Sequence, residues 1–245
     1  PPTPSFVGSV KMCIRDSVSI DPKNPNVVWV GTGENNNQRS VAYGDGVYKS
    51  VDGGASWKNM GLKSSEHIGN ILIHPENSDI VYVSAYGPLW NKGGDRGIYK
   101  TIDGGKSWNK ILFIDEHTGF NEIHMDPRNP DVLYATSHQR RRHVYTYVGG
   151  GPGSGIHKSV DGGNTWRKIN KGLPGVEIGR IGMDISDANP EVIYAIVEAS
   201  ERKGGFYKST NRGESWQKQS SKVTSGNYYQ EIFADPVDVL SLIHI

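Results

Sequence analysis

Four carboxylates in the long polar segments of the sequence could supply an acid and a base. Hydrolysis of a glycosidic bond uses two carboxyl groups, about 5 Å apart in retaining enzymes and up to ~9.5 Å apart in inverting ones. Spacing along the chain does not fix such a distance. Each carboxylate could equally be a solvated loop group or the partner of an arginine. The candidates for catalysis are Glu34, Glu66, Asp95 and Glu116.

The same segments carry arginines and aromatic side chains that could contact a ligand. Arginine recognises carboxylate and phosphate groups, and an aromatic ring can stack on a sugar. Three adjacent arginines cannot all face one carboxylate, so the run at 140–142 is either an anion or carbohydrate contact or a solvated basic loop. The candidate ligand-binding residues are Arg39, Trp90, Arg96, Arg140, Arg141 and Arg142.

No cofactor or metal site is predicted. The loop histidines His67, His117, His138 and His143 match no zinc spacing, and we expect His124 and His157, which fall in predicted strands, to pack. The glycine-rich stretch 149–153 is not followed by a predicted helix and therefore does not resemble a phosphate loop.

Composition excludes several classes of function. The 245 residues include 27 basic and 26 acidic side chains, so the net charge of +1 predicts neither a nucleic-acid partner nor a membrane surface. No apolar run approaches the ~20 residues of a membrane-spanning helix. With one cysteine, no intrachain disulfide framework is possible, and 31 glycines and 13 prolines indicate many turns.

An octapeptide recurs four times in the sequence. Ser50–Trp57, Thr101–Trp108, Ser159–Trp166 and Ser209–Trp216 share a hydroxyl residue, a short polar residue, glycine and a final tryptophan. We expect the short carboxylate to accept bonds from its own turn, the glycines to supply positive φ, and the tryptophan to pack beside a neighbouring repeat. A calcium loop would need acidic residues at alternating positions. The predicted structural residues are Asp52, Trp57, Asp103, Trp108, Asp161, Trp166, Asn211 and Trp216.

The repeat predicts an all-β propeller. Each period of about 53 residues holds four short β-type runs and no helical periodicity, which is the content of one propeller blade. The fourth copy has Asn211 and Arg212 where the others have Asp and Gly, so we expect a looser turn there.

We predict four four-stranded blades and the first strand of a fifth, as a fragment of a larger propeller; a closed four-bladed ring is the alternative. The predicted blades are 18–62, 63–115, 116–173 and 174–222, with the fifth starting at 223–236. Residues 1–17 and 240–245 break the pattern, resemble adapter read-through at the edges of metagenomic fragments, and are predicted to be non-native.

The octapeptides resemble Asp boxes, the BNR repeats of sialidases, xyloglucanase-type glycoside hydrolases and sortilin/VPS10 propellers. The long segments around Glu34, Asp95 and Arg140 are most similar to bacterial sortilin-like "glycosyl hydrolase" proteins. The resemblance covers residues 18–236 and implies the fold and a secreted, periplasmic or cell-surface location. No catalytic residue of these families carries over by motif, and the Phe/Tyr-Arg-Ile-Pro signature of sialidases is absent.

We therefore predict a module that binds a peptide or carbohydrate ligand and belongs to a larger exported protein, whose remaining blades are its other partners. The alternative is a glycoside hydrolase acting on a polysaccharide or a sialoglycan. A pair of buried, channel-facing carboxylates with raised pKa would favour the enzyme.

Overall fold

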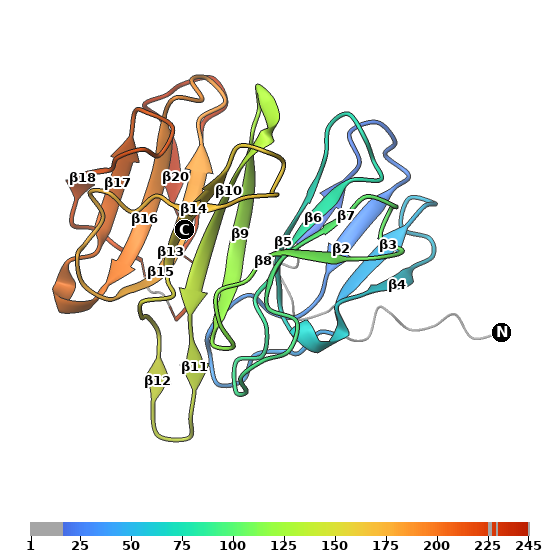
Figure 1. Cartoon of the computed structure of the whole chain (residues 1–245), viewed down its shortest axis with the longest axis horizontal. Helices are drawn as coiled ribbons and strands as arrows, with labels where there is room; N and C mark the ends of the chain where they lie inside the picture. Colours follow the sequence, from blue (N-terminus) through green and yellow to red (C-terminus); the bar gives the residue numbers. More distant parts are fainter. Residues whose placement is uncertain (1–16, 225–226, 229, 245) are drawn as a thin grey trace.

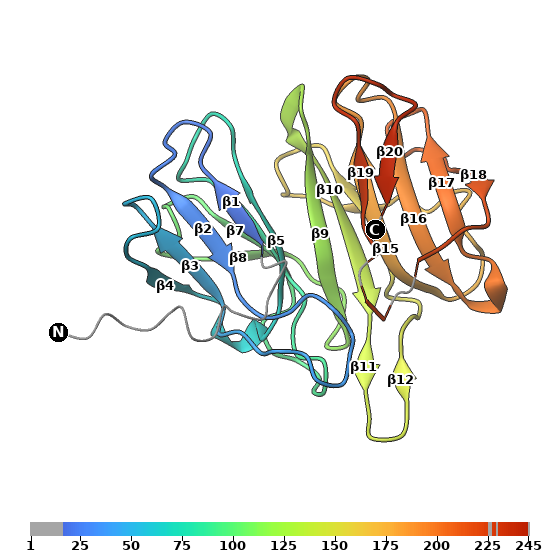
Figure 2. The same ribbon diagram turned by 180° about the vertical axis from the view of Figure 1, so that it is seen from behind.

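The computed structural model describes residues 17–224, 227–228 and 230–244, and its architecture is all-β (Figures 1 and 2). Four antiparallel sheets of four strands follow one another along the chain, as the repeat predicts. The first sheet contains β1 (Val18–Ile20), β2 (Val28–Gly31), β3 (Val47–Ser50) and β4 (Lys58–Gly61), and the second contains β5 (Ile68–Ile73), β6 (Val81–Ala85), β7 (Gly97–Thr101) and β8 (Asn109–Leu112).

The third and fourth sheets repeat this order. They contain β9 (Thr118–Asp126), β10 (Asn129–Gln139), β13 (Gly155–Ser159) and β14 (Arg167–Lys168), then β15 (Ile178–Ile185), β16 (Ile193–Ala199), β17 (Gly205–Ser209) and β18 (Gln217–Ser220). β19 (Ile232–Ala234) begins a fifth blade and pairs with β20 (Leu242–His244), which lies in the segment that sequence alone set aside. The remaining elements are the hairpin β11 (Arg141–Arg142) and β12 (Tyr147–Val148), and the short 3-10 turns η3 (Lys63–Ser65) and η4 (Ser200–Arg202).

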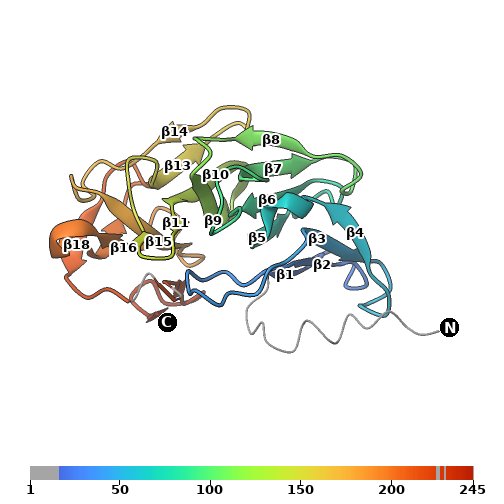
Figure 3. The ribbon, with the colours of Figure 1, turned by 90° about the horizontal axis from the view of Figure 1, so that it is seen from below.

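The first strand of each sheet lies innermost. β1, β5, β9, β15 and β19 contact one another in turn and surround a central channel. Figure 3 looks along this channel and shows the sheets arranged around it like the blades of a propeller. No helix in the described ranges is long and apolar enough to cross a membrane.

The hydrophobic core lies between neighbouring sheets. Trp29 and Val47 of the first sheet pack with Val81 and Val83 of the second, and equivalent buried clusters join the second to the third and the third to the fourth. A face of apolar strand residues can be buried only against the next blade, so each sheet depends on its neighbours for stability.

The octapeptide closes its turn as the sequence predicts. In the first copy the carboxylate of Asp52 accepts hydrogen bonds from the Ser56 amide at 2.8 Å and from the Ser50 hydroxyl at 2.7 Å. The Ser56 hydroxyl also donates to this carboxylate, and the bonds from Ser56 and Ser50 together lower the pKa of Asp52 to about 2. The fourth copy is not looser: Asn211 Oδ1 accepts from the Ser215 amide at 3.0 Å, and Arg212 takes the positive φ of 58° that glycine adopts elsewhere.

Three of the four repeated tryptophans contact the preceding blade. Trp108 Nε1 donates to the Met60 carbonyl and Trp216 Nε1 to the Ile169 carbonyl, each at 2.8 Å and each in the preceding blade. Trp108 also packs edge-on against Trp29, with 6.2 Å between ring centroids. Trp166 bonds instead to Gly163 in its own turn, while its ring packs against the preceding blade.

Candidate functional site

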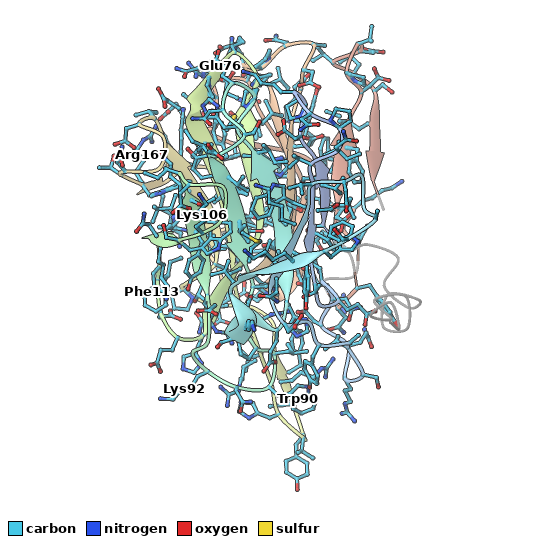
Figure 4. All side chains as sticks on the ribbon, turned by 90° about the vertical axis from the view of Figure 1, so that its right-hand side faces the viewer. Glu76, Trp90, Lys92, Lys106, Phe113 and Arg167 are labelled. Atoms are coloured by element: carbon cyan, nitrogen blue, oxygen red, sulfur yellow. The ribbon has the colours of Figure 1, made fainter. Side chains whose placement is uncertain are left out.

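The long connections gather at one end of the channel, which we call the loop-bearing face. Segments 32–46, 86–96 and 140–154 leave the first, second and third sheets there, and the β11–β12 hairpin projects furthest (Figure 1). Figure 4 places Trp90 and Lys92 at this end and Glu76, in a short turn, at the opposite end. Functional groups on rigid scaffolds usually lie in such loops.

One of these loops crosses the end of the channel. Residues 34–38, which we call the strap, leave the first sheet and reach the segment before β19, where the Asn37 amide donates to the Asn227 carbonyl at 3.0 Å. Figure 3 shows this blue segment reaching toward the dark red C-terminal segment. Asn35, Asn36 and Asn37 are all buried.

Arginines from two other sheets hold the strap. Arg180 Nη1 donates to the Asn35 carbonyl at 2.8 Å, and Arg140 Nη1 donates to the Asn36 carbonyl at 3.1 Å. Arg142 Nε donates to the Asn37 carbonyl at 2.9 Å. The strap thus connects the first sheet to the third and fourth through main-chain acceptors.

Within the described residues, buried Arg140 and Arg180 form no ion pair with an acid. The Arg140 guanidinium carbon lies 3.3 Å from the centroid of the Tyr86 ring, and that of Arg180 lies 6.0 Å from it. Neither side chain is in an ion pair within the described residues, and Arg140 Nε, Arg180 Nε and Arg180 Nη2 have no hydrogen-bond partner there. Burial lowers the pKa of Arg140 to about 10.

The guanidinium of Arg96 forms its hydrogen bonds within its own loop. Its guanidinium donates to the carbonyls of Gly93, Tyr86 and Asn91 at 2.7 to 3.0 Å, and also to that of Pro88. Burial lowers its pKa to about 9. Of the six predicted ligand contacts, Arg96, Arg140 and Arg142 are buried and Arg39, Trp90 and Arg141 reach the surface.

Three of the four predicted catalytic carboxylates have local partners. Glu34 accepts from Asn36 Nδ2 at 2.7 Å and from the Ala42 amide at 3.0 Å. Asp95 accepts from the Ser64 amide at 3.0 Å, and exposed Glu116 pairs with Lys92 at 3.1 Å.

Glu66 is half-buried, and its burial raises its pKa although Arg96 and Arg140 oppose the shift. In the described part of the chain, no two of the four carboxylates share a hydrogen-bond partner.

A polar group that sequence reasoning missed lies in the channel, whose cavity measures about 490 Å³. His124 lies 3.4 Å from a carboxylate oxygen of Glu122 and 3.7 Å from one of Asp184, so it contacts acids of two neighbouring inner strands. Burial raises the pKa of Glu122. The sequence signal for this group is the alternation of polar residues along a predicted inner strand, as for Glu122 and His124.

This channel group differs from a glycosidase pair. The two carboxylates are bridged by the protein's own imidazole, where a scissile bond would have to lie. No group of three or more His, Cys, Asp or Glu in the described residues could hold a metal ion.

Other cavities open at the surface. One, of about 770 Å³, lies between the third and fourth sheets, and its one lysine, Lys168, already donates to the Pro152 carbonyl. Another, of about 320 Å³, lies on the loop-bearing face, and we call it the basic pocket. Its lining residues are Lys92, His117, Gln139, Arg140, Arg141, His143 and Val148.

Comparison with known proteins agrees with this geometry. Residues 45–151 match the sortilin-Vps10 family model, described as sortilin, neurotensin receptor 3. A xyloglucanase of Hypocrea jecorina (strain QM6a) is 26% identical over 195 residues, which is 75% of this chain and 21% of that protein. A xyloglucanase of Paenibacillus sp. is 26% identical over 191 residues, which is 72% of this chain and 17% of that protein. The chain thus spans about a fifth of these relatives.

Solved structures show the same fold. The GH74 xyloglucanase from Xanthomonas campestris superposes with a TM-score of 0.69 at 13% identity, over 94% of this chain and 35% of that one. The Niastella koreensis GH74 enzyme gives 0.65 at 19% identity, over 91% and 33%. The chain is therefore an Asp-box β-propeller. Its relatives are the sortilin/Vps10 and xyloglucanase-type propellers.

Proposed function

We propose that this chain is a ligand-binding module, for a glycan or peptide, within a larger exported protein whose other blades are its partners. The observation that carries the proposal is the asymmetry of the propeller. Loops from three successive sheets and the basic pocket share one face, whereas the polar groups of the Asp-box turns form hydrogen bonds within those turns. A face whose polar groups can bind a ligand, positioned by a rigid scaffold, is suited to ligand recognition.

A glycan is favoured over a peptide as the ligand. The curated relatives are named xyloglucanases, and their name refers to a polysaccharide. Trp90 lies at the loop-bearing face and is partly exposed, and Tyr145 at the tip of the hairpin is 95% exposed. Exposed aromatic rings beside polar groups match the amphipathic surface of a sugar.

Binding by the intact protein to arrays of polysaccharides and of peptides tests the proposal. We expect Trp90→Ala to weaken binding of the captured ligand by roughly tenfold or more, since a central aromatic contact contributes at least ~1.4 kcal/mol. Lys106→Ala is the matched control because Lys106 is exposed and lies away from this face. Absence of binding across both arrays, or equal binding by both variants, would contradict the proposal.

The names of the relatives also favour a second candidate, a glycoside hydrolase acting on a polysaccharide or sialoglycan. Burial raises the pKa of Glu66, one of the four candidate catalytic carboxylates, which suits a general acid. A panel of polysaccharides assayed for reducing ends would show release by wild type and its loss in Glu66→Gln. A panel with no hydrolysis by wild type eliminates this candidate.

A further inference from the structure

The basic pocket is lined by cationic groups without any acid. Its lining includes the basic side chains of Lys92, Arg140 and Arg141 and the imidazoles of His117 and His143. A cluster of like charges is unfavourable unless an anion compensates it. The composition of the lining therefore points to an anionic ligand.

Main-chain hydrogen bonds between the second and third sheets fix the shape of the basic pocket. The Arg140 amide donates to the His117 carbonyl at 3.2 Å, and the Arg142 amide donates to the Leu89 carbonyl at 2.9 Å. The Gly93 amide donates to the Glu116 carbonyl at 2.8 Å. Because these bonds join the three segments that form the walls, the pocket exists before any ligand enters, which reduces the entropic cost of binding.

Two arginines that line the basic pocket each have a guanidinium nitrogen without a hydrogen-bond partner in the described residues. Arg140 is fully buried and Arg141 partly buried, and the Nε of each has no hydrogen-bond partner within the described residues. Buried polar atoms in native proteins nearly always have a partner. Of the acids beside the pocket, Glu116 is already paired with Lys92 in an exposed ion pair, which water screens, and Asp115 accepts a hydrogen bond from the His117 amide at 2.7 Å.

Further positive charge lies behind the pocket. Arg96 and Arg180 are fully buried, and neither takes part in an ion pair in the part of the chain that the structure describes. The acids that act on these arginines do so only through space: Asp115 and then Glu66 on Arg96, and Glu66 on Arg140. Charges of one sign behind low-dielectric walls strengthen the field at the opening of a cleft.

We propose that the basic pocket binds an anionic sugar unit of an acidic glycan, through a carboxylate or sulfate oxygen held by Arg141, with the buried charge of Arg140 behind it. This inference rests on the proposed function and names its ligand class. The volume of about 320 Å³ is at the low end of the ~300–1,000 Å³ of ligand sites, which suits one sugar unit. Recognition of a neutral peptide usually needs apolar side-chain pockets, and here Val148 is the one apolar residue of the lining.

Calorimetry on the intact protein tests the inference with four probes. The probes are an oligogalacturonate, a heparin-derived oligosaccharide, a neutral xyloglucan oligosaccharide and a poly-glutamate peptide. We expect one of the two acidic glycans to bind at least tenfold more tightly than the neutral one, and its affinity to fall as salt rises. The first two probes distinguish a carboxylate from a sulfate ester.

Charge reversal locates the contact. Arg141→Glu should weaken binding of the acidic glycan by tenfold or more, whereas Lys106→Glu, with the same charge change away from the pocket, should leave it unchanged. Arg141→Lys should restore part of the affinity. Circular dichroism and the unfolding midpoint establish that each variant is folded, and Arg141 is chosen over buried Arg140 for this reason.

Several outcomes would overturn the inference. One is equal affinity for neutral and acidic glycans, and another is unchanged binding in Arg141→Glu. Tighter binding of poly-glutamate than of either acidic glycan would replace the glycan with an acidic peptide. If neutral glycans bind in a Trp90-dependent manner and acidic ones do not, this inference fails while the proposed function stands; if no probe or array ligand binds, the proposed function fails.

Discussion

The guanidinium carbon of Arg140 lies over the Tyr86 ring, 3.3 Å from its centroid, and both side chains are fully buried. The same guanidinium donates to Asn36 of the strap and to the Gly87 carbonyl at 3.0 Å. The Tyr86 hydroxyl in turn contacts His138 Nδ1. One cation therefore joins segments of the first, second and third sheets, and it forms no ion pair in the described part of the chain. A cation–π contact in such a desolvated site is worth about 2 kcal/mol.

Replacing this cation should loosen the strap. Arg140→Met keeps most of the apolar stem but leaves the Asn36 and Gly87 carbonyls without their donor, so we expect the free energy of unfolding to fall by about 3 kcal/mol, since hydrogen bonds to charged groups contribute about 1.5–3 kcal/mol each. Urea denaturation measures the loss. Hydrogen exchange at 35–38 should accelerate more than exchange in β16.

Arg39→Met is the control for that experiment, because Arg39 belongs to the same loop and is exposed. A surface substitution of this kind changes stability by no more than about 0.5 kcal/mol. Equal destabilisation by the two variants would show that the guanidinium of Arg140 does not hold the strap.

The contrast between the Asp boxes and the strap shows what sequence can predict here. Asp52 and Ser56 are four positions apart, so the partner of each box residue can be read from the octapeptide itself. Asn36 and Arg140 are 104 positions apart, and no local pattern indicates that a main-chain carbonyl rather than a carboxylate will receive the guanidinium. The arginine run could be identified, but its burial could not.

The channel group was missed for a related reason. Glu122 and His124 stand two apart on one strand and therefore share a face, which the alternation of a strand predicts. Asp184 joins them only because the inner strands of successive blades meet around the channel. A repeat predicts that such strands are neighbours, but it does not predict which of their side chains meet across the gap.

Acid should weaken the fold through the Asp boxes. Hydrogen bonds from Thr165 and Ser159 lower the pKa of Asp161 to about 2, and those from Ser56 and Ser50 do the same for Asp52. A carboxyl group with a depressed folded-state pKa contributes stability that is present above its unfolded pKa of about 3.9 and is lost as the pH falls toward the folded value. We expect the melting temperature to fall between about pH 4 and pH 2.

An amide in place of the Asp161 carboxylate isolates this contribution. Asn211 already fills the equivalent position of the fourth box and keeps the amide and hydroxyl contacts of its turn, so Asp161→Asn should fold. The difference in melting temperature between this variant and wild type should shrink as the pH falls from 4 to 2. A difference that stays constant over this range would refute the assignment of the acid sensitivity to the box carboxylate.

His124 should titrate at an unusually high pH for a partly buried histidine. Burial lowers its pKa, but the hydrogen bond and charge of Glu122 and the charge of Asp184 outweigh that effect and raise it above the ordinary value near 6.5. A raised folded-state pKa contributes stability below the unfolded pKa that is lost as the pH rises through the folded one. Nuclear magnetic resonance of the ring protons measures the midpoint directly, and Glu122→Gln should lower it because burial remains while the hydrogen-bonded charge is removed.

His157 provides the internal control for the His124 titration. Burial lowers the pKa of His157 to about 4, and its ring bonds to the Ser137 hydroxyl at 3.0 Å, away from the channel acids. Its midpoint should therefore be the same in wild type and in Glu122→Gln. If both histidines shift together, the substitution has disturbed the third sheet as a whole; if neither shifts, the contact between Glu122 and His124 does not set the charge of the channel. A shift confined to His124 would show that one carboxylate from its own strand keeps a cation inside the propeller.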